Sequence, residues 1–281
     1  LIGRRLLSDE EREQVEQYLD RMLLIFCLMA GFLVGLVASG HWLDWIHFKY
    51  AVPFDYKDPL YGIDAGFYVF KLPLYVYLWR VVFYGFAIAL VVSVLVHFYQ
   101  EAIRIVGNAV HAIPQARSHI LLLLAGAFLT KAVGYRLDQF RLVYSPRGQV
   151  FFGACYADVH ARLPVMWILI VLCVIAAGIC LISIRGRRFF WPGGALAVVV
   201  LVAILGGWAY PALVQRLVVR PNQLAKERTY IAYNIEATNR AYGLDRIRDV
   251  PFKFRKEVDY ETLLANRLTL DNIRLWDHRP L

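Results

Sequence analysis

Three side chains that could carry a charge or a proton lie at helical spacing in a largely apolar stretch. Tyr135 and Asp138 follow Lys131 by four and seven positions, so on a helix all three share one face. An ionisable side chain inside a membrane helix is a functional candidate, and such a row could relay protons or ions. The alternative is a structural ion pair, in which Lys131 reaches toward the membrane surface and contacts Asp138 or another carboxylate. We expect the ion pair.

A second pair of candidate side chains, Asp158 and His160, precedes an apolar stretch that begins at Leu163. A carboxylate and an imidazole two positions apart could share a metal ion or an acid–base step. Asp158 is equally suited to cap a helix that enters the membrane at Leu163, with His160 at the interface. We favour the capping role because the sequence does not indicate which further residues would complete a site.

The other reactive residue types do not form a recognisable site. The four cysteines lack metal-binding spacing, and bulky residues surround His97, which leaves no room for a haem. The loop from 48 to 74 holds three aspartates without the calcium-binding spacing of an EF-hand. Serine hydrolase, zinc protease and nucleotide-binding motifs are absent from the sequence. We therefore expect no enzyme activity, no metal and no cofactor.

The composition that surrounds these residues indicates a membrane protein. Of the 281 residues, 59% are hydrophobic and 19% are charged, and the mean hydropathy is +0.48. Soluble domains have about 45–50% apolar and about 25% charged residues. Long apolar runs exclude a disordered chain, a disulfide scaffold and a soluble enzyme. The net charge of +9 does not indicate a nucleic-acid partner, because the Lys and Arg residues are spread over all the loops.

Five apolar stretches are candidates for membrane-spanning helices. A span needs about 20 residues, and four stretches meet this length or come close to it. The fifth is shorter and contains Lys131, but its pattern continues into residues that a membrane interface accepts. The expected fold is an all-α membrane bundle of five transmembrane helices over residues 22–40, 74–98, 120–135, 163–184 and 195–213.

The distribution of basic residues predicts the orientation of these helices. Segments 1–21, 100–118 and 185–190 hold nine Lys and Arg in 46 positions, against seven in 60 for the loops 41–73 and 136–162. Short loops rich in Lys and Arg stay in the cytoplasm. We therefore expect a cytoplasmic N-terminus, with a cytoplasmic amphipathic helix over 1–21 that begins at a capping box, Ser8 to Glu11, and leads into the first span.

The tail from 214 to 281 is then outside, and its pattern indicates the beginning of a mixed α/β extracytoplasmic domain. Ile231, Ile235 and Tyr242 recur at helical spacing, and Gly243 follows as a helix stop, which predicts a helix over 227–242. Residues 251–254 alternate as a short strand does. We expect the apolar face of the helix to be covered by protein, from this chain or from another.

Several longer motifs resemble those of an uncharacterised bacterial family of multi-pass membrane proteins, family 0182 of the UPF series. Members of this family have seven spans followed by a large extracytoplasmic domain, and no activity is established for them. The resemblance implies that this chain corresponds to the last five spans and the start of that domain, in the bacterial inner membrane. The motifs are Asp58–Phe70 with Leu72 and Pro73, Lys131–Asp138, Gly153–Pro164, Tyr210–Arg216, Pro221 with Asn222, Asn234–Thr238 and Ala241–Leu244.

Three functions are compatible with these observations. The first is a structural or interaction role, in which the spans anchor an extracytoplasmic domain or form a subunit of a larger membrane assembly. The second is a transporter or channel component that uses the Lys131 helix, and the third is a cell-envelope enzyme whose active groups lie mainly in the extracytoplasmic domain. We favour the first, with the lipid bilayer and other membrane subunits, or the remainder of its own chain, as partners.

Overall fold

The structure is a computed structural model that describes most of the chain after the first span. The described residues are 18, 21–22, 24–25, 28–29, 31–32, 34–106, 109–146, 152–186, 190–248, 250–251 and 259–273. The capping box at Ser8 to Glu11, nearly all of the helix predicted over 1–21 and the strand predicted after Pro251 lie outside them. The chain divides into two compact units, Leu1–Ile235 and Glu236–Leu281.

Four long helices within the described residues could cross a membrane by their length and apolar composition. They extend over Phe67–Tyr99, Pro114–Tyr144, Asp158–Ser183 and Phe190–Tyr242. These ranges contain the stretches predicted at 74–98, 120–135 and 195–213, and all but the last residue of the one predicted at 163–184. The first predicted span, 22–40, is described only in part, with residues 34–39 helical.

The predicted span that contains Lys131 is longer than its apolar core suggested. It belongs to α4, Pro114–Arg141, which has 28 residues. The sequence prediction stopped at 135 because Arg136 and Asp138 ended the apolar run, whereas the helix continues through them. Proline is in the first turn of α4, as it is in α3, Leu72–Tyr99, and in α5, Leu163–Ser183. At the start of α4 a proline presets the backbone and removes an N–H that the helix could not use. In α3 and α5 the proline follows a π-helical turn, Phe67–Lys71 and Asp158–Arg162, that continues into the helix.

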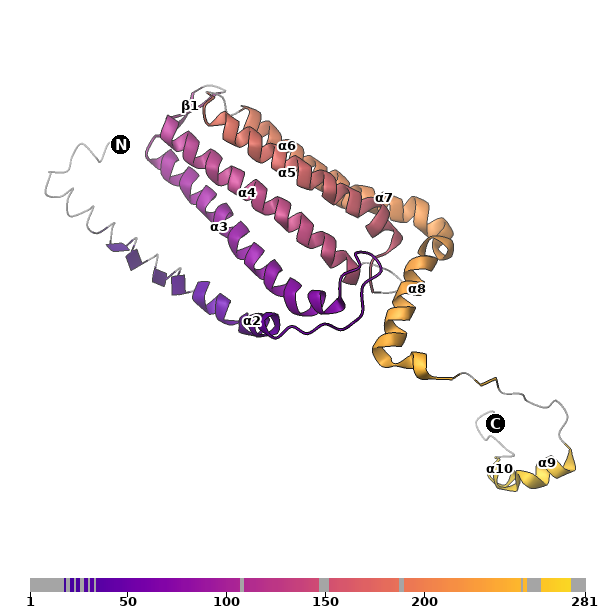
Figure 1. Ribbon diagram of the computed structural model, residues 1–281. Helices are drawn as coiled ribbons and strands as arrows, with labels where there is room; N and C mark the ends of the chain where they lie inside the picture. The colour runs from indigo at the N-terminus through magenta and orange to yellow at the C-terminus, as the bar shows by residue number, and fades with distance from the viewer. Residues whose placement is uncertain are drawn as a thin grey trace, which may run out of the picture. The chain divides into compact units, whose positions relative to one another are not determined.

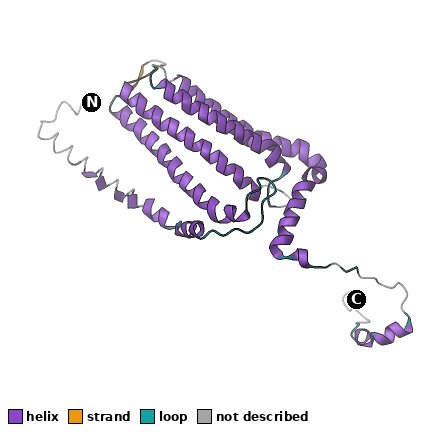
Figure 2. Cartoon of the chain, in the orientation of Figure 1, coloured by secondary structure: helices purple, strands orange, loops and turns teal. Residues whose placement is uncertain are grey.

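The helices α3, α4, α5 and α6, Phe190–Ile204, alternate in direction, and each packs against its neighbour in the chain (Figure 1). Small side chains at helical spacing allow α4 and α5 to approach closely, as in many membrane bundles. Figure 2 shows that helix is the main structure of the described chain. The buried contact between α4, α5 and α6 consists of Leu121, Ala125, Phe128, Ala132, Cys173, Ala176, Ala177, Cys180 and Val199.

Glycine also brings α3 close to α4. A Cβ atom on Gly134 would overlap the ring of Trp79, and one on Gly126 would overlap the ring of Phe86. The indole N–H of Trp79 donates a 2.7 Å hydrogen bond to the carbonyl of Thr130. The two glycines therefore form flat positions on α4 that accept aromatic rings from α3.

The two ends of the bundle have different connections. At one end a short antiparallel hairpin joins α3 to α4, with strands β1, Ile103–Val106, and β2, Ala109–Ala112. The sequence analysis did not predict these strands, because four-residue strands carry little pattern. At the other end lie α2, Trp42–Lys49, the long loop that follows it, and the start of α5. Residues 50–64 form that loop, in which an isolated antiparallel bridge joins Lys57 and Asp64 (Figure 2).

The last span continues as a bent helical path. After α6 come a π-helical turn, Leu205–Ala209, the short helix α7, Tyr210–Val214, and two further turns over 215–222. The path then bends into α8, Gln223–Tyr242 (Figure 1). The predicted stop is confirmed, since Gly243 follows α8 with φ of +64°, a conformation that glycine adopts without a steric penalty.

In the second unit, Glu236–Leu281, the described residues beyond α8 include a 3-10 turn at Leu244–Arg246 and two short α-helices. They are α9, Tyr260–Ala265, and α10, Arg267–Asp271. Asp259 caps α9 by accepting a 2.8 Å hydrogen bond from the Thr262 N–H. Hydrogen bonding from the side chain of Thr262, and next from this N–H, holds the pKa of the Asp259 carboxyl below its usual range. Ile235 is 53% exposed and Tyr242 is 79% exposed, so the described residues of this chain do not cover these two side chains, and the expectation that protein covers the apolar face of α8 stays a prediction.

Candidate functional site

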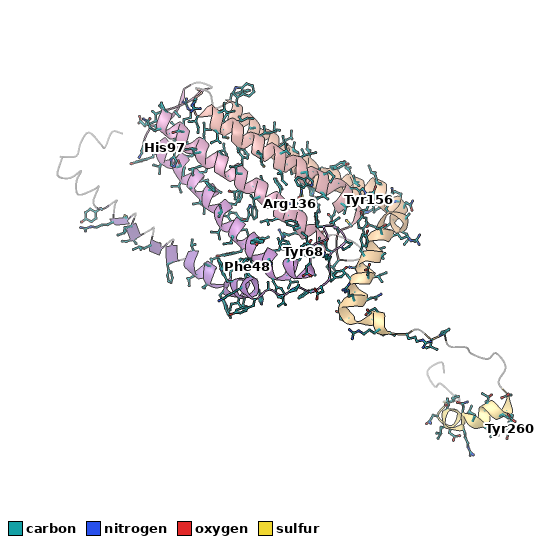
Figure 3. The ribbon with its side chains drawn as sticks, in the orientation of Figure 1. Phe48, Tyr68, His97, Arg136, Tyr156 and Tyr260 are labelled. Atoms are coloured by element: carbon teal, nitrogen blue, oxygen red, sulfur yellow. The ribbon has the colours of Figure 1, made fainter. Side chains whose placement is uncertain are left out.

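Three buried carboxylates lie where the α2–α3 loop, the end of α4, the start of α5 and the start of α8 meet. Asp58 is 4% exposed, and Asp158 and Glu227 are each 2% exposed. Figure 3 shows Arg136 and Tyr156 toward this end of the bundle and His97 at the opposite end. A buried charge is costly unless hydrogen bonds or an opposite charge compensate for it. The partners of each carboxylate therefore indicate what it does.

Asp58 organises the loop before α3. One carboxylate oxygen accepts hydrogen bonds from the N–H groups of Leu60 and Tyr61 at 2.9 and 2.7 Å. The other accepts from the N–H of Ile63 at 3.0 Å and from the hydroxyl of Tyr68 at 2.7 Å. All four donors come from the chain itself. Asp58 is one of the three loop aspartates considered as calcium ligands in the sequence, and its hydrogen bonds to the backbone stabilise a tight turn.

The same turn is attached to α4 through Tyr61 and Gln139. The Tyr61 hydroxyl donates to the Gln139 carbonyl at 2.9 Å, and burial raises the pKa of Tyr61 to about 12. The Arg136 guanidinium donates to the Gln139 side-chain oxygen at 2.7 Å and lies over the rings of Phe140 and Trp167. The Tyr61 hydroxyl and the Arg136 guanidinium therefore both donate to Gln139, and the bond from Tyr61 connects the loop to the end of α4.

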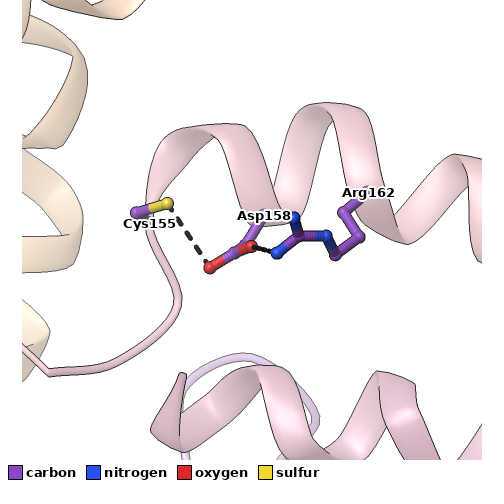
Figure 4. A network of polar contacts seen from close by, with 3 residues as sticks. All are labelled: Cys155, Asp158 and Arg162. Carbon is purple, nitrogen blue, oxygen red and sulfur yellow. Dashed lines mark hydrogen bonds and ion pairs between the residues drawn. The ribbon is translucent and has the colours of Figure 1, made fainter. Parts of the chain in front are cut away.

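Asp158 forms the second buried group, together with Cys155 and Arg162 (Figure 4). An Arg162 nitrogen lies 2.7 Å from one carboxylate oxygen, and the Cys155 thiol donates to the other at 3.4 Å. The predicted capping role of Asp158 is therefore incorrect. The residue lies one turn inside the helical segment, in the π-helical turn Asp158–Arg162, and pairs with the side chain four positions later. This added turn was not visible in the apolar pattern.

His160 does not share a site with Asp158. Its side chain is exposed, and its ring stacks on Tyr156 with centroids 4.1 Å apart. Its Nδ1 lies 3.4 Å from the hydroxyl of Tyr230 on α8. Asp158 and His160 are close in the sequence but have separate partners. Asp158 contacts buried groups, whereas His160 contacts Tyr156 and Tyr230 at the surface.

Glu227 on α8 is the third buried carboxylate, and the sequence analysis missed it. Its carboxylate accepts a 3.0 Å hydrogen bond from the N–H of Tyr156. Asn234, two turns further along α8, donates to the carbonyl of Phe152 at 2.8 Å. Glu227, Tyr230 and Asn234 share one face of α8, so this face is attached to the segment 152–160. The partners are 70 to 82 positions apart in sequence, and no local pattern could have indicated them.

Lys131 differs most from its predicted environment. Its ammonium lies over three rings, at 5.4 Å from the centroids of Trp79 and Phe83 and at 4.9 Å from that of Tyr135. Across the described part of the chain, Lys131 has no carboxylate within ion-pair distance. Asp138 pairs instead with Arg141, at 3.0 Å. Cation–π contacts thus replace the expected ion pair.

Tyr135 and Asp138 line a cavity of about 600 Å³ between α4, α5 and the path that follows α6. Arg141 and Arg162 also contribute to its wall, and Gly207 and Trp208 lie on the opposite side. Of the five predicted cluster residues, the cavity therefore brings together Tyr135 and Asp138. Lys131 contacts the ring of Tyr135, whereas Asp158 and His160 take part in the contacts described above.

The buried thiol of Cys155 is expected to resist alkylation in the folded chain. Burial, with the nearby Asp158 carboxylate as the next cause, raises the pKa of Cys155 to about 12. At pH 8 about one thiol in ten thousand would then be the reactive thiolate, against roughly one in four at an ordinary pKa. Iodoacetamide treatment followed by peptide mapping measures this, with the urea-unfolded chain as the control. Equal labelling of the folded and unfolded chains would contradict the buried arrangement.

The helices and their connections define a candidate multi-pass membrane protein whose buried carboxylates fasten loops to helix ends. The chain belongs to the uncharacterised protein family UPF0182, whose family model matches residues 3–281. It is 36% identical to a UPF0182 protein of Sulfurovum sp. (strain NBC37-1) over 267 residues and 34% identical to one of Trichodesmium erythraeum (strain IMS101) over 280 residues. These alignments cover 92% and 98% of this chain.

The family resemblance predicted from the sequence motifs is thus confirmed. The chain spans 28% and 30% of the length of these two relatives, so it corresponds to one part of a longer protein. No solved structure matches the chain.

Proposed function

We propose that this chain is a membrane anchor that attaches the beginning of an extracytoplasmic domain to a helical bundle through the helix α8. The proposal places it in the bacterial inner membrane, with the N-terminus in the cytoplasm and the tail outside. The observation that carries the proposal is the attachment of α8 to the segment 152–160 through Glu227, Tyr230 and Asn234. A flexible tether between a span and a domain would need none of these contacts.

The chemistry of this attachment supports a structural role. Glu227 is 2% exposed. Burial raises the pKa of its carboxyl, and the directed hydrogen bond from the Tyr156 N–H stabilises the charged form and offsets part of this rise. The contacts recur at positions i, i+3 and i+7, so α8 is fixed along two turns and not at one point. α8 leads directly into the unit Glu236–Leu281. A fixed α8 would therefore attach the following unit to the bundle through a helix and not through a flexible tether.

Transport through the Lys131 helix is the second candidate. It is supported by a basic side chain within a candidate span and without a carboxylate partner among the described residues. However, the ammonium is surrounded by the rings of Trp79, Phe83 and Tyr135. An ion pathway needs polar groups that can exchange partners, and aromatic rings offer none. We therefore place the structural role first and propose no catalytic activity.

Hydrogen exchange tests the anchoring role directly. In the full chain in detergent, the change Glu227→Ala is expected to accelerate exchange at the backbone amides of residues 226–234 and of Tyr156 by about tenfold or more, since about 1.4 kcal/mol of lost contact free energy corresponds to tenfold. Glu236→Ala removes the same charge from an exposed position of the same helix and should leave these rates unchanged. If the two variants behave alike, α8 is not held by this contact and the anchoring proposal fails.

A further inference from the structure

The cavity between α4, α5 and the α6–α7 path has a charged end and an apolar end. Arg141 and Arg162 lie toward the end of the bundle where the spans leave the apolar region, and Leu169 and Ala203 lie further along their helices. The cavity extends from Arg162 to Leu169 along α5, about 10 Å at roughly 1.5 Å per residue. It therefore has the length of a lipid headgroup with its glycerol backbone and first methylene groups.

The charge of the cavity wall favours an anionic group. Its lining includes two arginines and one aspartate. Arg141 uses one guanidinium nitrogen for Asp138, at 3.0 Å, and its side chain is 42% exposed. A guanidinium has five N–H donors in a planar fork, a geometry that suits phosphate oxygens. Arg141 can therefore hold an oxyanion while it keeps its contact with Asp138.

The deeper lining is suited to hydrocarbon. Met166, Leu169, Ala203 and Gly207 present apolar surface, and a Cβ atom built on Gly207 would meet no other atom within 4 Å. The aromatic side chains of Tyr144 and Trp208 complete the wall, and such side chains are enriched at the level of lipid headgroups. Along the cavity the charged lining is thus followed by apolar lining, which matches the order of the headgroup and the acyl chains in a phospholipid.

We propose that this cavity binds one phospholipid, with its phosphate on Arg141 and the beginning of an acyl chain along Leu169, Ala203 and Gly207. Arg162 lines the α5 side of the cavity and keeps its ion pair with Asp158 at 2.7 Å, so Arg141 is the main ligand of the phosphate. The proposal is independent of the anchoring role, because the cavity involves neither Glu227 nor α8. The bound lipid would fill the space between three helices that otherwise have no side chain there.

The first variant places a side chain in the cavity and leaves the other lining residues unchanged. Gly207→Leu places a side chain in the open space, and Gly193→Leu on α6 is the matched control, since a Cβ atom there also meets nothing. Arg141→Gln removes the proposed phosphate ligand by a second route. Native mass spectrometry of the full chain, freed of lipid in detergent and titrated with dioleoyl-phosphatidylglycerol, reports binding. Diacylglycerol and inorganic phosphate serve as probes of the two halves of the ligand.

One tightly bound phosphatidylglycerol is expected for the unaltered chain and for Gly193→Leu, with at least tenfold weaker binding for Gly207→Leu and for Arg141→Gln. Diacylglycerol should not occupy the site, and millimolar phosphate should not displace the lipid. Unchanged binding in Gly207→Leu would overturn the proposal, and so would equal binding of diacylglycerol. Displacement by phosphate alone would show that the cavity is a site for free phosphate and would likewise overturn the lipid assignment.

Discussion

The change Asp158→Ala is expected to destabilise the helix bundle by about 3–5 kcal/mol, the usual cost of removing one partner of a buried ion pair. Asp158 is 2% exposed, and the side chain of Arg162 is 16% exposed. Without the carboxylate, the guanidinium would remain in a poorly solvated position beside an apolar helix. The loss should appear as a lower midpoint in denaturant-induced unfolding of the detergent-solubilised chain.

An exposed pair of the same chemistry is the matched control. Asp138 and Arg141 lie 3.0 Å apart with 32% and 42% of their side chains exposed, so Asp138→Ala should cost less than about 1 kcal/mol. The double change Asp158→Leu with Arg162→Met should cost less than Asp158→Ala, because it leaves no unpaired charge. A loss in Asp158→Ala no greater than in Asp138→Ala would show that the buried pair contributes little.

Removal of the Asp58 carboxylate is the second change with a large expected effect. Asp58→Ala leaves three backbone N–H groups and the Tyr68 hydroxyl without their acceptor. Buried donors that lose a charged partner cost about 1–3 kcal/mol each, and partial hydration of the opened turn reduces the sum to about 3–5 kcal/mol. Unfolding midpoints measure the loss, and faster proteolysis between residues 55 and 66 should accompany it.

Two further variants separate the hydrogen bonds of Asp58 from general effects on the loop. Asp58→Asn retains one acceptor oxygen and should have an intermediate effect. Asp64→Ala removes a less buried carboxylate from the same loop, one that accepts from backbone N–H groups including those of Phe54 and Gly66, and it should disturb the bundle less because water can replace the lost acceptor. Equal effects for Asp58→Ala and Asp64→Ala would contradict a special role of the buried turn.

The membrane helices were predictable from the sequence because apolar runs of this length have few other stable structures. The same holds for α8, whose end at Gly243 follows from the need for a positive φ angle after the last helical turn. Both signals are local, since they depend on residues within a few turns of each other. The boundaries were less accurate, because charged residues such as Arg136 and Asp158 belong to helices that extend beyond the apolar core.

The candidate site was only partly predictable, because its contacts are distant in sequence. The helical row predicted a partner for Lys131 at Asp138, but seven residues correspond to about 10 Å along a helix, whereas α3 presents Trp79 and Phe83 directly to the ammonium. Glu227 and Tyr156 are 71 positions apart. Which carboxylate is buried depends on the packing of segments that a single sequence does not place.

The aromatic surroundings of Lys131 have an electrical consequence. Rings attract a cation through their quadrupole but carry no net charge, so they do not neutralise an ammonium as a carboxylate would. A charge in a membrane experiences the transmembrane voltage, worth about 2.3 kcal/mol per elementary charge for 100 mV across the whole thickness. An ion pair would cancel most of this force. If α4 spans an energised membrane, a charged Lys131 would be drawn toward the negative side, and the rings of Trp79, Phe83 and Tyr135 would hold the ammonium against that pull.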